Sequence, residues 1–185
     1  MKISAVIVLV LVLAGCGGTQ RSSAFGEVPL LLGRSPSADE AGVYLATQRG
    51  YDTAEGVELV LQREGNADLR LTDSPPAGCV VVQVIVRPDE LVLCADEVIL
   101  QDERDKVLAV ARALARGYTQ AQWEPGEAVS AVTTAEPDVD REELSAALDD
   151  AVPTWTSGAE YFGQLEAGQG RDPSIAREAA ERENY

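Results

Sequence analysis

From residue 28 to residue 167, apolar and polar residues alternate in the patterns of short strands and amphipathic helices. Strands are expected at residues 28–32, 57–62, 80–86 and 90–94, the third being an unbroken β-branched run typical of a buried strand. Helices are expected at residues 37–50, 101–118, 125–133 and 140–150, with capping boxes at Ser37 and Asp140 and a stop at Pro153. The polar stretch 64–78 predicts no element. The strand–helix–strand order over residues 28–62 predicts an α/β fold with a small, largely parallel sheet and flanking helices.

The first 15 residues have the pattern of a secretory signal: Lys2 precedes an apolar run from residue 3 to residue 14. That run is shorter than the roughly 20 residues that span a bilayer. It ends in Leu13-Ala14-Gly15-Cys16, which resembles a bacterial lipobox, where cleavage before the cysteine is followed by its acylation. An ordinary signal with a chance cysteine is the alternative. The lipobox interpretation predicts a protein anchored through Cys16 to the outer face of the cell membrane.

The remaining chain divides into three expected parts. Residues 16–27 are small and polar, and predict a lipid anchor followed by a flexible tether. Residues 28–167 predict one α/β domain, and residues 168–185 a polar C-terminal tail in which Asp172-Pro173 could open a short helix.

Charge and composition exclude several functions. The chain of 185 residues has a formal net charge of −16, which argues against sequence-independent nucleic-acid binding. It contains no His, so His-based acid–base catalysis, a Ser-His-Asp triad and His metal ligands are excluded. No phosphate-binding, nucleophile-elbow or dinucleotide motif is present. We therefore expect no enzyme activity and no cofactor.

Two cysteines, Cys79 and Cys94, remain after the lipobox. An exported chain meets an oxidising environment, which favours a disulfide between the two neighbouring predicted strands. Two buried, unpaired thiols are the alternative, and the geometry of the fold decides between a disulfide and free thiols.

The order of residues in two stretches carries a family resemblance. The first stretch is Pro36-Ser37-Ala38-Asp39-Glu40-Ala41-Gly42-Val43-Tyr44, followed by Arg49-Gly50-Tyr51-Asp52 and Glu55-Gly56-Val57-Glu58. The second is Glu90 to Cys94, then Asp102-Glu103-Arg104 and Ala113 to Tyr118, continued by Glu124 to Val129 and Leu144 to Leu148. Their order resembles the NMT1/THI5-like family of periplasmic solute-binding proteins, which serve ABC importers and bind thiamine-pyrimidine precursors, riboflavin or sulfonates. The resemblance implies a single lobe of a type II periplasmic-binding-protein fold, because the second lobe has no counterpart here.

The resemblance also implies candidate ligand contacts at Arg34, Ser35, Ser37, Glu40 and Tyr44. Glu40 stands where the family has His, Ser37 where it has Asn, and Arg34 where an aromatic ring often stacks on the ligand. A pocket of the family's shape would therefore offer a charged pair instead of neutral stacking. The alternative is that Ser37 and Glu40 only cap a helix and Tyr44 only packs in the core.

Two other groups of side chains have a structural and a functional interpretation. Trp123, Trp155, Tyr161 and Phe162 could line a groove, but aromatic residues are more often core. The acids at positions 138, 140, 142, 143, 149 and 150 could bind Ca²⁺, but they lack EF-hand spacing and better fit a solvated helix face. We expect no metal site.

Two functions remain open. The first is a monomeric, membrane-anchored binding protein that passes a small organic solute to an ABC permease. The second is a reduced, transport-incompetent lipoprotein that acts as an interaction or structural module, because one lobe cannot enclose a ligand by hinge closure.

Overall fold

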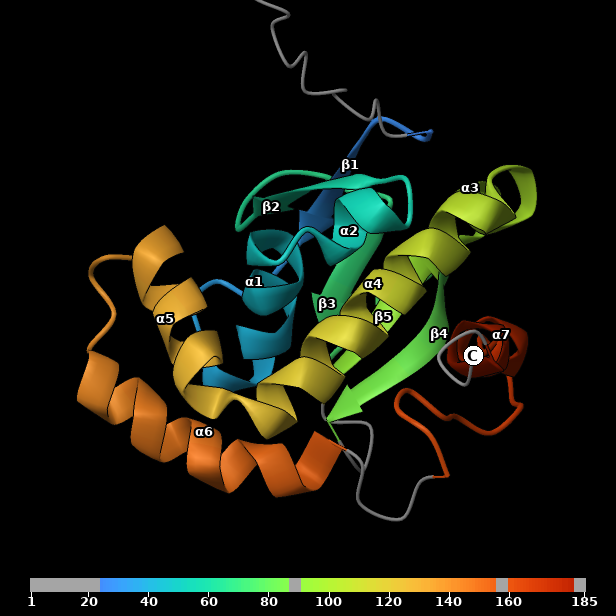
Figure 1. The fold of residues 1–185 in the computed structure, drawn as a ribbon. Coiled ribbons are helices and arrows are strands. Elements are labelled where there is room, and N and C mark those ends of the chain that lie inside the picture. The colour runs from blue at the N-terminus through green and yellow to red at the C-terminus, as the bar shows by residue number, and fades with distance from the viewer. Residues whose placement is uncertain (1–23, 87–90, 156–159, 182–185) are drawn as a thin grey trace, which may run out of the picture.

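The computed structural model describes residues 24–86, 91–155 and 160–181, and within them one five-stranded sheet runs in the order β2-β1-β3-β5-β4 (Figure 1). The strands are β1 (Glu27–Leu31), β2 (Glu58–Gln62), β3 (Leu69–Thr72), β4 (Cys79–Val86) and β5 (Leu91–Asp96). Strand β1 pairs in parallel with β2 and β3, whereas β5 is antiparallel to both β3 and β4. The α/β class is confirmed, but the sheet is mixed, with a parallel half and an antiparallel half that share β3.

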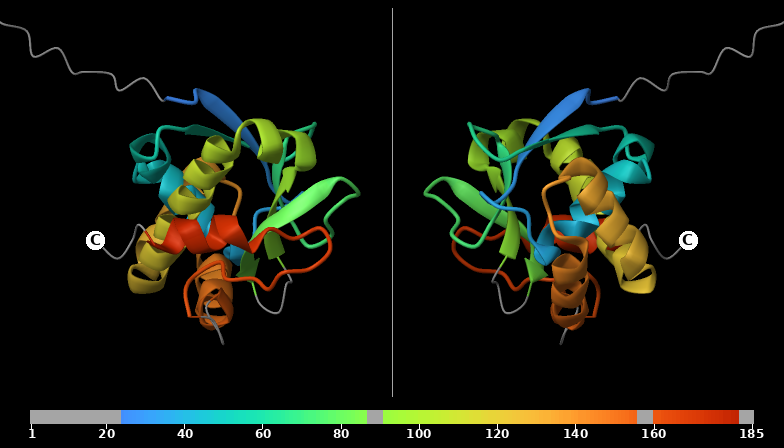
Figure 2. Two further views of the ribbon diagram at one scale, coloured as in Figure 1. Left: turned by 90° about the vertical axis from the view of Figure 1, so that its right-hand side faces the viewer. Right: turned by 90° about the vertical axis from the view of Figure 1, so that its left-hand side faces the viewer.

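Helices connect and cover these strands. A 3₁₀ turn η1 (Ala38–Glu40), α1 (Ala41–Gln48) and α2 (Tyr51–Ala54) link β1 to β2; after β5 come α3 (Glu97–Asp102), α4 (Arg104–Trp123), α5 (Pro125–Ala135), α6 (Arg141–Trp155) and α7 (Pro173–Glu181). The side views show α1 and α4 on one side of the strands, where their apolar residues join the main core (Figure 2).

The two halves of the sheet differ in how their faces are covered. In β1 and β3, buried and less buried residues alternate, so one face packs on the helices and the other does not. In β4 and β5 most residues are buried and none is exposed. Leu165 and Ala176 pack against Val81, Val84 and Cys94 on the second face of this half. The antiparallel half is therefore covered on both faces and the parallel half on one.

A pair of glycines lets α1 and α4 cross closely. A Cβ atom on Gly117 would lie 2.2 Å from the carbonyl oxygen of Gly42, and one on Gly42 would lie 2.4 Å from the Tyr118 ring. Gly117 thus serves helix packing and does not end α4, which continues to Trp123 and not only to the expected end at residue 118. The close crossing fixes α1, and with it the loop that precedes α1, against the core.

The structure corrects the expected elements at three places. Residues 64–78 contain β3, which alternates apolar and polar residues over only four positions. Residues 97–102 form α3, whose first turn is capped by the Asp96 side chain. Pro153 lies inside α6, which continues to Trp155. Trp155 is fully buried and packs edge-on against Tyr118, with ring centroids 4.9 Å apart, so tertiary packing outweighs the lost backbone hydrogen bond.

The C-terminal part is also different from expectation. The helix opened by Asp172-Pro173 is α7, and its buried residues Ile175, Ala176 and Ala179 pack into the fold. Before it, Gly163 and Arg171 form bridges to β4. The described residues from 168 to 181 are therefore part of the domain and not a separate polar tail.

Candidate functional site

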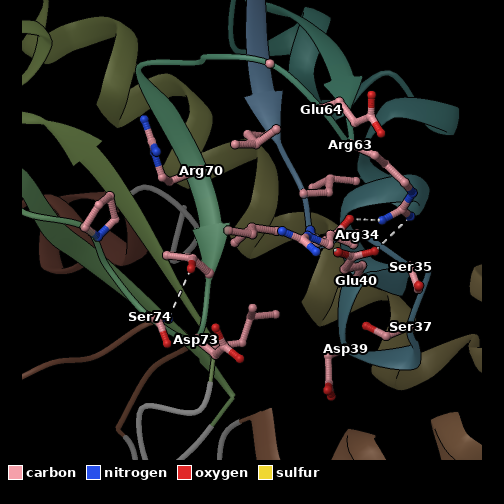
Figure 3. Close-up of a pocket in the computed structure, with 18 residues that line it drawn as sticks. Arg34, Ser35, Ser37, Asp39, Glu40, Arg63, Glu64, Arg70, Asp73 and Ser74 are labelled. Carbon is pink, nitrogen blue, oxygen red and sulfur yellow. Dashed lines mark hydrogen bonds and ion pairs between the residues drawn. The ribbon is translucent and has the colours of Figure 1, made fainter.

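A cleft of about 1040 Å³ opens at the edge of the sheet where β1, β2 and β3 end. Its walls are residues 31–35, 37, 39 and 40 after β1, residues 63–65 after β2, and residues 70–74 and 76 at the end of β3, with Leu91 of β5. Figure 3 shows Ser37, Asp39 and Glu40 on one side and Arg70, Asp73 and Ser74 on the other. Most of its side chains are polar or charged.

The position of this cleft follows from the topology. From β1 the chain moves to β2 on one side of it, and then returns to β3 on its other side. In open α/β sheets, ligands bind outside the carboxyl ends of parallel strands at such a reversal of strand order. The cleft is therefore placed where this class of sheet presents ligand contacts.

An ion pair between the buried Glu40 and the partly buried Arg63 supports one wall. Glu40 is 2% exposed. Its Oε1 accepts a hydrogen bond of 2.8 Å from the Gly33 backbone N–H, and its Oε2 lies 3.0 Å from Nη2 of Arg63. The Nη1 of Arg63 donates to the Gly33 carbonyl at 2.6 Å. The pair therefore binds both backbone polar groups of Gly33.

A second carboxylate, from the residue that follows α5, holds the same guanidinium. The Nε of Arg63 donates to Oε1 of Glu136 at 3.0 Å, and the Tyr44 hydroxyl donates to that oxygen at 2.7 Å. Arg63 also donates to the Tyr44 hydroxyl oxygen. We call Glu40, Tyr44, Arg63 and Glu136 the Arg63 cluster. It joins β2, α1 and the end of α5 beside the cleft.

Burial and hydrogen bonding shift the pKa values within this cluster in different directions. Burial raises the pKa of Glu40, although the hydrogen bond and charge of Arg63 oppose it. The Tyr44 hydrogen bond lowers the pKa of Glu136, and Arg63 adds to that effect against partial burial. Burial and the hydrogen bond to Glu136 raise the pKa of Tyr44 well above its usual value, so its hydroxyl stays a donor.

The structure brings together four of the five candidate ligand contacts. Arg34, Ser35, Ser37 and Glu40 line the cleft, whereas Tyr44 lies behind it in the Arg63 cluster. Ser37 is the N-cap residue of η1, but its side chain makes no capping hydrogen bond, so this half of the expected capping box is wrong. The predicted cap at Asp140 does form, with its Oδ1 accepting from the N–H groups of Glu142 and Glu143.

Donor groups gather on the wall formed by residues 33–37. Arg34 is exposed and, within the described part of the chain, no hydrogen-bond or ion-pair partner is found for its side chain. The hydroxyls of Ser35 and Ser37 line the same wall. These groups can donate to an acidic or carbonyl oxygen of a solute. Arg70, by contrast, uses Nη2 on the Ala67 carbonyl at 2.7 Å.

Other predicted residues lie away from the cleft. Cys79 and Cys94 form a disulfide between β4 and β5, with Cα atoms 5.7 Å apart. Trp155 and Phe162 are buried and contact Tyr118, whereas Trp123 is 79% exposed at the end of α4. Cys16 and the signal lie outside the described residues.

Among the described residues, no group of three or more Asp, Glu or Cys side chains is placed to hold a metal ion. In the same residues no helix has the length and apolar composition needed to cross a membrane.

Sequence reasoning did not identify Arg63, Arg70 or Glu136. Arg63 comes directly after a predicted strand, where polar residues of parallel sheets gather, and this signal could have indicated it. Glu136 reaches Arg63 only through the packing of α5, so no local pattern marks it. No protein-family model matches the chain, and no curated protein sequence matches it.

Proposed function

We propose that the protein is a lipid-anchored, extracytoplasmic binding protein that supplies a small organic solute to an ABC importer. The observation that carries the proposal is the polar cleft at the carboxyl ends of β1, β2 and β3, beside the residues of the NMT1/THI5-like resemblance. The wall of Arg34, Ser35 and Ser37 offers donors to an acid group, and on this ground we favour the sulfonate-like class of solute over a thiamine-pyrimidine or riboflavin. The carboxylates of Asp39, Glu64 and Asp73 line the same cleft and oppose an anion, so the acid group has to bind at the Arg34 wall.

A specific observation favours a second candidate, the reduced lipoprotein that no longer transports. The cleft is open, and in the described residues a single sheet with its loops forms all of its walls. Hinge closure requires two bodies that move around the ligand. A protein of this kind would keep the fold and the anchor but would bind solutes weakly or not at all.

A thermal-shift panel separates the two candidates. The probes are ethanesulfonate, an aminopyrimidine, riboflavin and spermidine, each added to the purified protein. We expect ethanesulfonate to raise the melting temperature and Arg34→Met to remove that increase. Arg49→Met is the matched control, because Arg49 is also exposed but pairs with Glu124 and Glu127 away from the cleft. No increase with any probe favours the reduced lipoprotein.

The lipid anchor has its own test. Replacing Cys16 by Ser removes the acylation site, so we expect the protein to move from the membrane to the soluble fraction after cell lysis. Ser22→Ala, a change in the tether, serves as control and should stay in the membrane fraction. Membrane retention of the Cys16→Ser variant contradicts the lipoprotein proposal.

A further inference from the structure

Arg63 contacts segments that are far apart in the chain. Its guanidinium donates to Gly33 after β1, to Glu40 and Tyr44 near α1, and to Glu136 at the end of α5. Four of the five N–H donors of the guanidinium are therefore used on protein acceptors. The side chain is 19% exposed and also lines the cleft.

Gly33 is the residue on which these contacts converge at the cleft. Its N–H and its carbonyl are each bound by one member of the Glu40–Arg63 pair. A Cβ atom at this position would lie 3.2 Å from Oε1 of Glu40, so the carboxylate packs directly against the backbone. The next residues, Arg34 and Ser35, begin the donor wall. The backbone position of Gly33 therefore determines where the chain enters the donor wall at Arg34.

Glu136 and Tyr44 fix the guanidinium from the other side. Glu136 accepts from Nε of Arg63 and from the Tyr44 hydroxyl on the same oxygen, so α1 and α5 both orient it. An ammonium group cannot reproduce this arrangement, because it is a single point on a flexible stem and not a planar fork. The geometry requires an arginine.

Arg49 gives the contrasting case on the same pair of helices. It pairs with Glu124, the N-cap residue of α5, and with Glu127 in its first turn, and its side chain is 39% exposed. Neither of these pairs contacts the cleft backbone. Pairing with two carboxylates therefore does not by itself connect an arginine to the cleft.

We infer that Arg63 is a positioning residue for the cleft: through Gly33 it holds the 33–37 loop, and so the donors Arg34, Ser35 and Ser37, in the binding conformation. The inference rests on the proposed function for its effect on affinity, but its effect on the loop is independent of any ligand. Glu136 and Tyr44 act on the cleft only through Arg63.

The test measures amide hydrogen exchange and ethanesulfonate affinity in the full chain carrying Arg63→Lys, Arg63→Met, Glu136→Gln or the control Arg49→Met. In Arg63→Lys we expect exchange of the Gly33 and Ser37 amides, which donate to Glu40, to rise about tenfold, the loss expected for a charge-assisted hydrogen bond, while β1 and α1 keep their protection. Affinity should fall roughly tenfold in parallel. Glu136→Gln should give the same local effect at smaller size, and Arg49→Met none.

The outcomes separate this inference from the proposed function. Unchanged exchange of the Gly33 and Ser37 amides in both Arg63 variants, or an equal rise throughout β1 and α1, overturns the positioning role. A local rise in a protein that binds no ethanesulfonate supports the positioning role and counts against the solute proposal. Binding that is equally tight in wild type and Arg63→Lys overturns the inference and leaves the proposed function intact. If Arg63→Met does not fold, Arg63→Lys and Glu136→Gln decide.

Discussion

The parallel and antiparallel halves of one sheet are built differently. In the antiparallel half, β4 and β5 are covered on both faces, and the Cys79–Cys94 disulfide joins them. In the parallel half, β1 and β3 pack on helices with one face only, while Arg70 and Thr72 face the other way. The cleft and the Arg63 cluster are both found at the end of this half.

The most buried strands therefore lie in one half of the sheet and the candidate binding site in the other. Burial of both faces stabilises β4 and β5 and leaves no open face for a solute, although the Gln83 side chain of β4 is buried there and donates to the Ala111 carbonyl at 3.2 Å. A face left open at the ends of parallel strands exposes backbone and side-chain donors, and there the Glu40–Arg63 ion pair contacts the loop backbone at Gly33. The two halves should therefore respond differently to substitution.

The largest effect is expected at the strand that both halves share. Leu69 of β3 is fully buried, so Leu69→Ala should lower the free energy of unfolding by about 2–5 kcal/mol through lost burial and a cavity. Urea denaturation measures it, with Val98→Ala as control because Val98 is 66% exposed. A loss below about 1 kcal/mol would mean that β3 is not a core strand.

Loss of the disulfide should weaken the antiparallel half and leave the cleft unchanged. The bridge spans 15 residues, and replacing both Cys79 and Cys94 by Ala should lower the free energy of unfolding by about 3 kcal/mol. A reducing agent should bring the wild type to a similar value and leave the variant unaffected. Exchange of the Gly33 and Ser37 amides should not change, and a large increase there would contradict the proposed separation of the two halves.

The smallest effect is a change in the pH dependence of stability. The pKa of Glu136 is lowered in the folded protein, so its ionised form stabilises the fold above the ordinary Glu pKa of 4.5, and this contribution is lost as the pH falls through the folded value. Burial raises the pKa of Glu40 in the folded protein. The stability that its protonated form contributes is therefore present below the ordinary Glu pKa and is lost as the pH rises through the raised folded value.

Removing the Glu136 contribution should therefore flatten the acid side of the stability curve. In Glu136→Gln, urea denaturation should show a smaller loss of stability than wild type as the pH falls from about 5 to about 3. Glu58→Gln is the control, since Glu58 is exposed on β2. Identical slopes in wild type and Glu136→Gln would show that this carboxylate is not coupled to the fold.

The sequence predicts elements best where local pattern and tertiary environment agree. The unit β1–α1–β2, the apolar strand β4, helix α5 and the Asp140 cap are each visible in residue order. Strand β3 is short, carries Arg70 and Thr72 on its open face and lies in a polar stretch, so its alternation is too brief to identify. The helical state of Pro153 depends on the burial of Trp155, which no local pattern contains.

The same limit applies to the cleft. Arg34, Ser35 and Ser37 were implied by the family resemblance, and they follow the first parallel strand, which is a recurrent ligand position in such sheets. Glu40 was expected to cap a helix or contact a ligand, and its main partner, Arg63, is 23 residues away. Glu136 is 73 residues from Arg63 and meets it only after α5 packs. Contacts between distant segments depend on the whole fold, and a single sequence does not show them.

The most direct test of the binding proposal is to map, by nuclear magnetic resonance, which backbone amides shift when ethanesulfonate is added to the protein. We predict saturable shifts confined to residues 33–37, 63–65 and 70–74, around the cleft, and their loss in Arg34→Met. An absence of saturable shifts, or shifts centred on the antiparallel half instead, would contradict the proposal that this cleft binds an acidic solute.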